Sequence, residues 1–262
     1  AKQNLSFTRL TALAVSMTRT SSSSSVPTTV RRSAPQAWRW RIMLVTAVVS
    51  FGVLAAVQAF VGRFYVVPSS SMEPTLQGCT DCPESNDRIV VDKLAYRFGD
   101  PQPGDVAVFD GTESWHSGFS SPRSNNRFLR GLQNVGSAIG VVAPDANSFV
   151  KRVIAIEGQT VQCMPGDPGV LVDGRVIAEP YLADPPAHRV DGPGGAQECG
   201  GDFFGPVTVP QGHVWVMGDN RTNSLDSRAY LGDPQQGTVP VDNFIGKVRG
   251  IFLPLDRFGG LE

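Results

Sequence analysis

The stretch Pro68-Ser69-Ser70-Ser71-Met72-Glu73-Pro74-Thr75-Leu76 lies between two segments with the pattern of β-strands, and the rest of the chain is organised around it. Three consecutive serines between two prolines are common in linkers. The flanks argue against a linker, because Arg63–Val67 leads directly into the stretch and β-branched residues resume at Ile89. Each proline fixes φ and lacks a backbone donor, so the segment between them is stiff. A stiff turn that carries serines suits a nucleophile, provided that the chain supplies a base.

Upstream of this stretch, residues 42–62 form an uncharged run in which only Thr46, Ser50 and Gln58 are polar. A helix of that length extends about 30 Å, which matches the hydrocarbon core of a bilayer. We therefore expect a transmembrane helix, since the run is too long for the apolar part of a cleavable signal peptide. Residues 1–41 are polar and basic and are expected to form a disordered cytoplasmic tail, with residues 63–262 on the other side of the membrane.

The composition favours a β-rich body and argues against a nucleic-acid partner. The 262 residues include 28 glycines and 20 prolines, which indicates frequent turns. Seven of the 23 basic residues and none of the 24 acidic residues lie before Arg63, which leaves the remaining chain a net charge of −8. Such an acidic body would repel phosphate groups.

Beyond Arg63 the sequence predicts a mostly β, antiparallel domain with one helix. The helix is expected over residues 127–142, where apolar residues recur at helical spacing. Val170–Ile177 carries Asp173-Gly174 at its centre, which is typical of a β-hairpin. Residues from about 164 to 206 are expected to be an irregular insertion. The other expected strands are Arg88–Leu94, Val106–Phe109, Phe149–Ile156, Val207–Val209, His213–Met217 and Phe244–Leu253.

Four cysteines, Cys79, Cys82, Cys163 and Cys199, favour disulfides over a metal site in a domain outside the membrane. Cys163 and Cys199 could close one loop, and Cys79-Thr-Asp-Cys82 could close a small ring or bind zinc. Three connectivities remain open. A zinc site would need a second Cys-x-x-Cys or grouped histidines, which the sequence lacks, so we expect neither a metal nor a cofactor.

A base for the serine stretch is not found among the three scattered histidines. Lys151 stands inside the apolar strand Phe149–Ile156, next to Arg152. Alternation places these two cations on opposite faces, so one of them is expected to face inward. Burial disfavours the ammonium form, and a neutral lysine is a competent general base. The alternative is that both side chains point to solvent at a sheet edge.

A third polar cluster, Gly218-Asp-Asn-Arg-Thr-Asn-Ser-Leu-Asp-Ser-Arg228, follows an apolar strand. One interpretation is a hydrophilic loop with Asx-turns and an ion pair between Asp226 and Arg228. The other is a frame in which the Ser224 hydroxyl orients the lysine amine and the ion pair maintains the shape of the loop.

Four stretches resemble bacterial type I signal peptidases, the membrane-bound serine proteases that remove signal peptides from exported proteins. They are residues 68–75, 103–109, 151–155 and 218–228, in the family's order after the apolar run. The resemblance covers about residues 42–255 and implies an antiparallel β fold with a larger insertion between the lysine and the last stretch. One apolar run precedes these stretches here, whereas some members of the family have two spans.

The resemblance also implies the roles of the site residues. Ser71 would be the nucleophile and Lys151 the general base, with the Ser69 hydroxyl and the Ser71 backbone N–H forming the oxyanion hole. Ser224 would position the lysine, with Asp226 and Arg228 as a structural ion pair beside it. Met72 is a candidate wall of the substrate pocket. The implied partners are signal peptides of secreted preproteins, membrane lipid and the nearby translocation machinery, for a single-pass cell-membrane protein.

Two other classes of protein remain open. A self-cleaving, repressor-type Ser/Lys protease would carry a DNA-binding helical domain at its N-terminus, where this chain has an apolar run. A membrane-anchored β-domain that acts only as a scaffold would not need the serine or the lysine. A preprotein cleavage assay on Ser71→Ala and Lys151→Ala variants separates these classes.

Overall fold

The computed structural model describes residues 36–79, 85–116, 124, 126–138, 148–190 and 192–261. The chain divides into two compact units, Ala1–Val45 and Thr46–Glu262, and helix α1 (Gln36–Phe60) includes the boundary between them. The helix begins six residues before the predicted start at Ile42, and the rest of the predicted tail lies outside the described residues. The large apolar side chains described along it, between Trp38 and Val57, are exposed. Among the described residues, no helix combines the length and the apolar character needed to cross a membrane.

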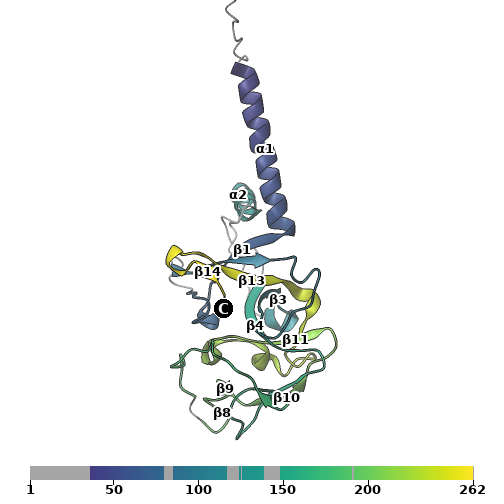
Figure 1. The fold of residues 1–262 in the computed structure, drawn as a ribbon, viewed down its shortest axis with the longest axis vertical. Coiled ribbons are helices and arrows are strands. Elements are labelled where there is room, and N and C mark those ends of the chain that lie inside the picture. The colour runs from purple at the N-terminus through teal and green to yellow at the C-terminus, as the bar shows by residue number, and fades with distance from the viewer. Residues whose placement is uncertain are drawn as a thin grey trace, which may run out of the picture. The chain divides into compact units, whose positions relative to one another are not determined.

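The body is an eight-stranded antiparallel sheet in the order β1-β2-β13-β3-β4-β11-β12, with β14 paired to β13 (Figure 1). This confirms the mostly β, antiparallel fold. Strands distant in sequence are neighbours here, so β4 lies between β3 and β11 and receives contacts from both sides. The strands are β1 (Gly62–Val66), β2 (Arg88–Asp92), β3 (Val106–Asp110), β4 (Ser148–Ile156), β11 (His213–Met217), β12 (Val239–Pro240), β13 (Phe244–Leu253) and β14 (Gly259–Gly260).

The segment between β4 and β11 forms two smaller sheets. One has the order β10-β5-β6-β7, and the other pairs β8 with β9. The predicted hairpin is confirmed, because Asp173 and Gly174 join β6 to β7 with positive φ at both positions, as a type I′ turn requires. The predicted insertion therefore contains short strands, namely β5 (Thr160–Cys163), β6 (Leu171–Val172), β7 (Arg175–Val176), β8 (Gly195–Ala196), β9 (Gly201–Asp202) and β10 (Phe204–Thr208).

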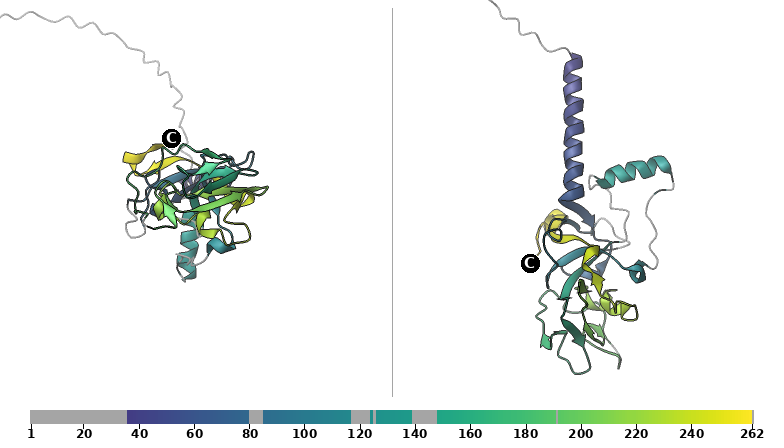
Figure 2. Two further views of the ribbon diagram at one scale, coloured as in Figure 1. Left: turned by 90° about the horizontal axis from the view of Figure 1, so that it is seen from below. Right: turned by 90° about the vertical axis from the view of Figure 1, so that its right-hand side faces the viewer.

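Helices are few and mostly short. Helix α2 (Arg127–Ala138) lies where a helix is predicted, and residues 139–142 of that prediction lie outside the described residues (Figure 2). Asn126 caps it, since its side-chain oxygen accepts from the backbone N–H of Phe128. The 3₁₀ helices are η1 (Ser70–Met72), η3 (Glu113–His116), η4 (Arg221–Asn223), η5 (Ser227–Tyr230), η6 (Val241–Asn243) and η7 (Leu255–Arg257).

The predicted cysteine pair Cys163–Cys199 forms a disulfide with an S–S distance of 2.02 Å. Both cysteines are buried in a core cluster that also contains Phe204 and Trp215. Cys79 is disulfide-bonded as well, whereas Cys82 lies outside the described residues. A second core cluster contains Met72, which comes directly after Ser71. The serine stretch is thus attached to the core at its last helical residue.

Candidate active site

Ser71 and Lys151 meet although 80 residues separate them in the sequence. Ser71 lies in the short helix η1, and Lys151 lies in the middle of β4. The Lys151 Nζ donates to the Ser71 Oγ at 2.7 Å. The backbone of η1 is fixed from the other side by Asn220, whose backbone N–H donates to the Ser71 carbonyl and whose side chain donates to the Ser70 carbonyl. Met72 is completely buried below this turn.

Burial changes the protonation of Lys151, which is only 4% exposed. Loss of hydration lowers the pKa of its ammonium group from the ordinary 10.5 to about 8. The carboxylates of Asp226 and Asp219 act in the opposite direction, and the nearby Arg228 lowers the pKa further. With a pKa near 8, about one amine in ten is neutral at pH 7, which is far more than for an unperturbed lysine. This amine can therefore accept the proton of the serine that it contacts.

Arg152 is also buried, at 5% exposed, on the opposite face of β4. The alternative that both cations point to solvent is therefore wrong, and both face protein. Arg152 forms a two-point ion pair with Asp219, with Nε to Oδ1 at 2.8 Å and Nη2 to Oδ2 at 2.6 Å. The Tyr181 ring covers the guanidinium group at 3.9 Å from its centroid. This pair is not predictable from the local sequence pattern, although Asp219 belongs to the polar cluster at residues 218–228.

The Gly218–Arg228 loop contains the predicted ion pair. Arg228 donates from Nε and Nη2 to the two Asp226 oxygens, both at 2.8 Å. Asp226 also accepts from the Gly218 backbone N–H at 3.0 Å. Burial alone would raise the pKa of the Asp226 carboxyl, but Arg228, Lys151 and the Gly218 N–H together hold it below its ordinary value. Asp226 is therefore ionised at neutral pH, and its charge acts on the amine of Lys151.

The remaining predicted site residues lie at different distances from the pair. The Ser69 Oγ is 3.3 Å from the Ser71 Oγ. The Ser70 Oγ accepts from the Asn223 side chain, away from the amine. The Ser224 Oγ, which we expected to orient the lysine, is buried and has no hydrogen-bond partner among the described residues. Met72, the expected pocket wall, packs in the core with Tyr65 and Leu76.

A second unanticipated ion pair connects the loop to the insertion. The Arg221 Nη1 donates to Glu179 at 2.9 Å, and the Nε donates to the Gly218 carbonyl at 3.1 Å. Burial alone would lower the pKa of the Arg221 guanidinium, but Glu179 raises it above the ordinary value. No sequence signal singles out Glu179. The presence of Arg221 inside a polar cluster was the only clue that the loop needed a further carboxylate.

A cavity of about 580 Å³ adjoins the loop. Ser224, Leu225 and Arg228 form one of its sides, and residues 188–190 and 200–204 of the insertion form the other. The cavity thus lies between the Gly218–Arg228 loop and the disulfide-closed part of the chain.

These features define a class of enzyme. A serine hydroxyl that contacts a buried, partly neutral lysine amine can attack a carbonyl group, with the lysine as proton acceptor, so the molecule is a hydrolase of the Ser/Lys type. The family model described as "Signal peptidase, peptidase S26" matches residues 38–253. The chain therefore belongs to the signal peptidase family S26.

Several known proteins are similar to this chain. Signal peptidase I of Mycobacterium tuberculosis is 54% identical over 223 residues, which cover 83% of this chain and 73% of that protein. The probable signal peptidase I of Mycobacterium leprae is 49% identical over 236 residues, 86% of this chain and 78% of that protein. The crystal structure of a signal peptidase I from Enterococcus faecalis has a TM-score of 0.34 at 22% identity, covering 57% of this chain and 97% of that one.

Proposed function

We propose that this chain is a type I signal peptidase, an endopeptidase that cleaves N-terminal signal peptides from exported preproteins after small residues. The observation that carries the proposal is the 2.7 Å contact between the Lys151 amine and the Ser71 hydroxyl, in a chain of family S26. The burial of Lys151 supports its role as base, because it makes the neutral amine available near neutral pH.

The proposed reaction is acyl transfer in two stages. Neutral Lys151 takes the Ser71 proton while the Ser71 oxygen attacks the carbonyl carbon of the scissile bond. The Ser69 hydroxyl and the Ser71 backbone N–H donate to the resulting oxyanion. Protonated Lys151 then donates to the leaving amine, and the peptide bond breaks. A water molecule, activated by the same amine, hydrolyses the acyl ester and regenerates Ser71.

The Gly218–Arg228 loop is proposed to position the lysine. The ion pair of Asp226 with Arg228 is within electrostatic reach of the amine, which supports this role. Ser224 is proposed as a hydroxyl that meets the amine during the reaction. Its support is the close packing at Gly218, where a side chain would collide with both the Ser224 Oγ and the Ser71 carbonyl. Loss of kcat in a Ser224→Ala variant, at unchanged KM, would support this role.

We also propose that residues 42–62 anchor the chain in the membrane, with the N-terminus in the cytoplasm and the catalytic domain outside. The support is the uncharged sequence of this run and the exposure of apolar side chains along α1. Signal peptides and the translocation machinery would then meet the enzyme at the membrane surface. Extraction of membranes with alkaline carbonate tests the anchor, and release of the full chain into the supernatant would contradict it.

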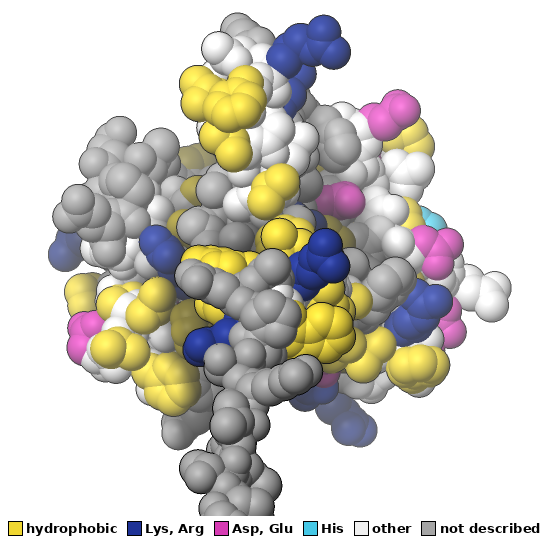
Figure 3. Space-filling view, turned by 90° about the horizontal axis from the view of Figure 1, so that it is seen from above, with side chains coloured by type: hydrophobic (Ala, Val, Ile, Leu, Met, Phe, Trp, Pro, Cys, Tyr) yellow, Lys and Arg dark blue, Asp and Glu magenta, His cyan; other side chains and the backbone are white. Residues whose placement is uncertain are grey.

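Lipid contact outside the anchor is proposed for helix α2. Its apolar side chains Phe128, Leu129, Leu132 and Val135 are exposed, and it carries Arg127 and Arg130 but no acidic residue. A basic amphipathic helix of this kind favours an anionic lipid surface. Figure 3 shows the molecule from above, with hydrophobic side chains and Lys and Arg side chains on the same face.

The decisive experiment is cleavage of a preprotein by the detergent-solubilised full chain. Ser71→Ala and Lys151→Ala should each abolish processing while the fold survives. Ser148→Ala and Lys247→Ala serve as matched controls, because these side chains bond Asp110 and Asp105 outside the reacting pair. Ser148 is a sharp control, since it stands three residues before Lys151 in the sequence. Near-normal cleavage by either site variant would contradict the proposal.

A further inference from the structure

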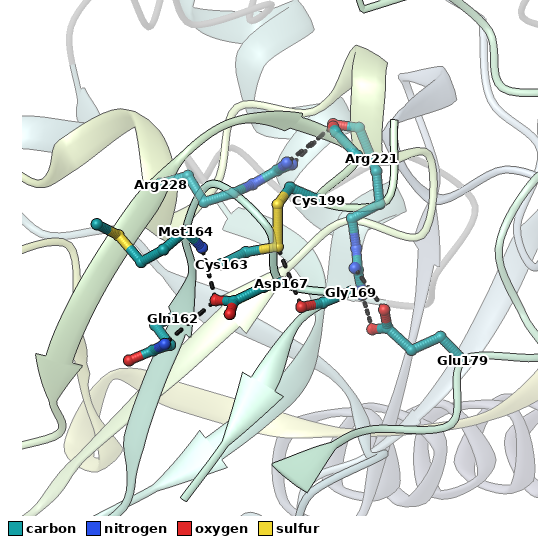
Figure 4. Close-up of a disulfide and its surroundings, with 10 residues drawn as sticks. Gln162, Cys163, Met164, Asp167, Gly169, Glu179, Cys199, Arg221 and Arg228 are labelled. Carbon is teal, nitrogen blue, oxygen red and sulfur yellow. Dashed lines mark hydrogen bonds and ion pairs between the residues drawn. A yellow bond between two sulfur atoms is a disulfide. The ribbon is translucent and has the colours of Figure 1, made fainter. Parts of the chain in front are cut away.

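Cys199 of the Cys163–Cys199 disulfide is followed in the sequence by Gly200, which contacts the Gly218–Arg228 loop. Cys163 ends β5, and Cys199 lies in the turn between β8 and β9. Figure 4 shows Arg221 and Arg228 beside the two cysteines. None of these side chains reacts with substrate in the proposed mechanism. Their arrangement therefore needs a separate explanation.

Gly200, the residue after Cys199, packs against both arginines. Its carbonyl accepts from the Arg228 Nη1 at 3.0 Å. Its φ is +66°, which favours glycine, and a Cβ at this position would collide with the Arg221 side chain. The position of the Gly200 backbone thus determines the positions of both arginine side chains.

Each arginine bonds the insertion with one part of its guanidinium group and the loop with another. Arg228 bonds Gly200 and the two oxygens of Asp226. Arg221 bonds Glu179 and the Gly218 carbonyl. Arg228 also donates to the Arg221 carbonyl at 2.7 Å, so the two arginines are connected to each other. Movement of the insertion at Gly200 would therefore be transmitted to both ends of the loop.

The loop in turn contacts the reacting pair. The Asn220 backbone N–H, within this loop, donates to the Ser71 carbonyl at 3.1 Å. Gly218 packs against the same carbonyl so closely that no side chain fits. Continuous contacts thus lead from the disulfide through Gly200, the two arginines and the loop to Ser71.

Gly200 lies in a short turn, in which its backbone N–H donates to the Gln197 carbonyl at 3.0 Å. Strands β8 and β9, which flank it, pair over only two residues each, and a two-stranded ribbon of this size is marginal in water. The disulfide closes a separation of 36 residues and ties this ribbon to β5 in the buried core. It is therefore a covalent constraint on the position of Gly200.

We propose that the Cys163–Cys199 disulfide is a positioning element of the active site, which holds Gly200 against Arg221 and Arg228 and thereby keeps the Gly218–Arg228 loop in register with Ser71 and Lys151. This inference rests on the proposed peptidase function. We therefore expect loss of the disulfide to lower kcat and to leave KM nearly unchanged.

The test compares a Cys163→Ser/Cys199→Ser double variant with Gly200→Ala, which keeps the disulfide but displaces Arg221. Both should lower kcat about tenfold with little change in KM, as loss of positioning predicts. Because the two changes act on one chain of contacts, combining them should lower kcat by much less than the product of the separate effects. Glu198→Gln is the matched control, since this exposed side chain precedes Cys199 and should leave activity unchanged.

The pH profile distinguishes positioning from mere stabilisation of the insertion. Arg228 lowers the pKa of Lys151 and Asp226 raises it, so displacement of Arg228 should move the acidic limb of kcat/KM to higher pH. Kinetics are measured at temperatures where thermal unfolding shows each variant folded. If the double variant does not fold, Gly200→Ala alone decides.

The outcomes separate this inference from the proposed function. If the wild-type chain does not cleave preprotein, the proposed function fails. If the wild type cleaves, and the variants match it in kcat or keep its pH profile, the positioning inference is overturned while the peptidase function stands. A lower kcat, a shifted acidic limb and non-additive effects together support it.

Discussion

The two faces of strand β4 carry adjacent cations with opposite properties. Lys151 and Arg152 are 4% and 5% exposed, so burial does not distinguish them. Arg152 faces Asp219, which bonds its guanidinium at two points. Lys151 faces the uncharged hydroxyl of Ser71, and its pKa is lowered to about 8. On one face the cation is thus bonded to a carboxylate, and on the other face a fraction of the Lys151 amines is neutral near neutral pH.

The difference shows that burial alone does not make a base. Removal from water disfavours any isolated cation, but a bonded carboxylate restores the charged state. Lysine also suits the unpaired face better than arginine, because its amine can lose a proton and the guanidinium cannot. The carboxylates near Lys151 act at a distance, so they moderate the shift without cancelling it. Substitutions that change the charge or the partner of the cation on one face at a time test this difference.

The largest effect is expected when the neutral amine is removed and the charge kept. Lys151→Arg should lower kcat at least about a thousandfold, because a permanently protonated side chain cannot act as base. Arg152→Lys is the matched exchange on the other face and should retain most activity. The measurement is preprotein cleavage by folded variants. Substantial activity in Lys151→Arg would refute a proton-accepting role for this residue.

A large loss of protein stability is expected when the ion pair between Arg152 and Asp219 is broken. Asp219→Ala leaves Arg152 buried without its carboxylate, which should lower the free energy of unfolding by about 3–5 kcal/mol. Arg249→Ala, which breaks a more exposed pair with Asp92, should cost less than about 1 kcal/mol. Urea unfolding of both variants measures the difference. Equal losses would mean that burial of the Arg152 pair contributes nothing.

The pH dependence of activity reports the protonation of Lys151, which has no carboxylate bonded to its amine among the described residues. Because the pKa of Lys151 is about 8, kcat/KM should fall with an apparent pKa near 8 and decrease about tenfold for each further pH unit toward acid. A plateau that extends unchanged to pH 6 would contradict a lysine base.

The smallest effect is a gain in stability. The lowered pKa of Lys151 means that the unfolded chain binds more protons between about pH 8 and 10.5, so stability rises with pH across this window. Below pH 8 the buried amine costs about 3 kcal/mol. Lys151→Met removes this cost and the bond to Ser71, so it should raise the free energy of unfolding at pH 7 by about 1–3 kcal/mol. The gain should disappear toward pH 10.5, and a constant gain at all pH values would argue for better packing instead.

The sequence predicts the proposed reacting pair better than its surroundings. A stiff serine turn, a cation inside an apolar strand and the continuous Gly218–Arg228 motif are local patterns that made these residues candidates, and the resemblance to type I signal peptidases implied their roles. The partner of Arg221 could not be predicted, because Glu179 lies 42 residues away in a segment without regular periodicity. Gly200 is one of 28 glycines, and only packing against Arg221 distinguishes it. The burial of both Lys151 and Arg152 also needed the fold, since Lys151 meets Ser71, and Arg152 meets Asp219 and Tyr181, from segments distant in the sequence.

Met72 has a consequence for genetic screens of this enzyme. It is completely buried, and it is the immediate chain neighbour of Ser71, the proposed nucleophile. Substitutions of residues that pack with it, such as Leu76 or Ile89, would displace Ser71 without changing either residue of the proposed catalytic pair. A screen for lost secretion would therefore recover such core variants together with true active-site variants. Measuring processing and thermal unfolding on the same purified variants would be needed to separate them.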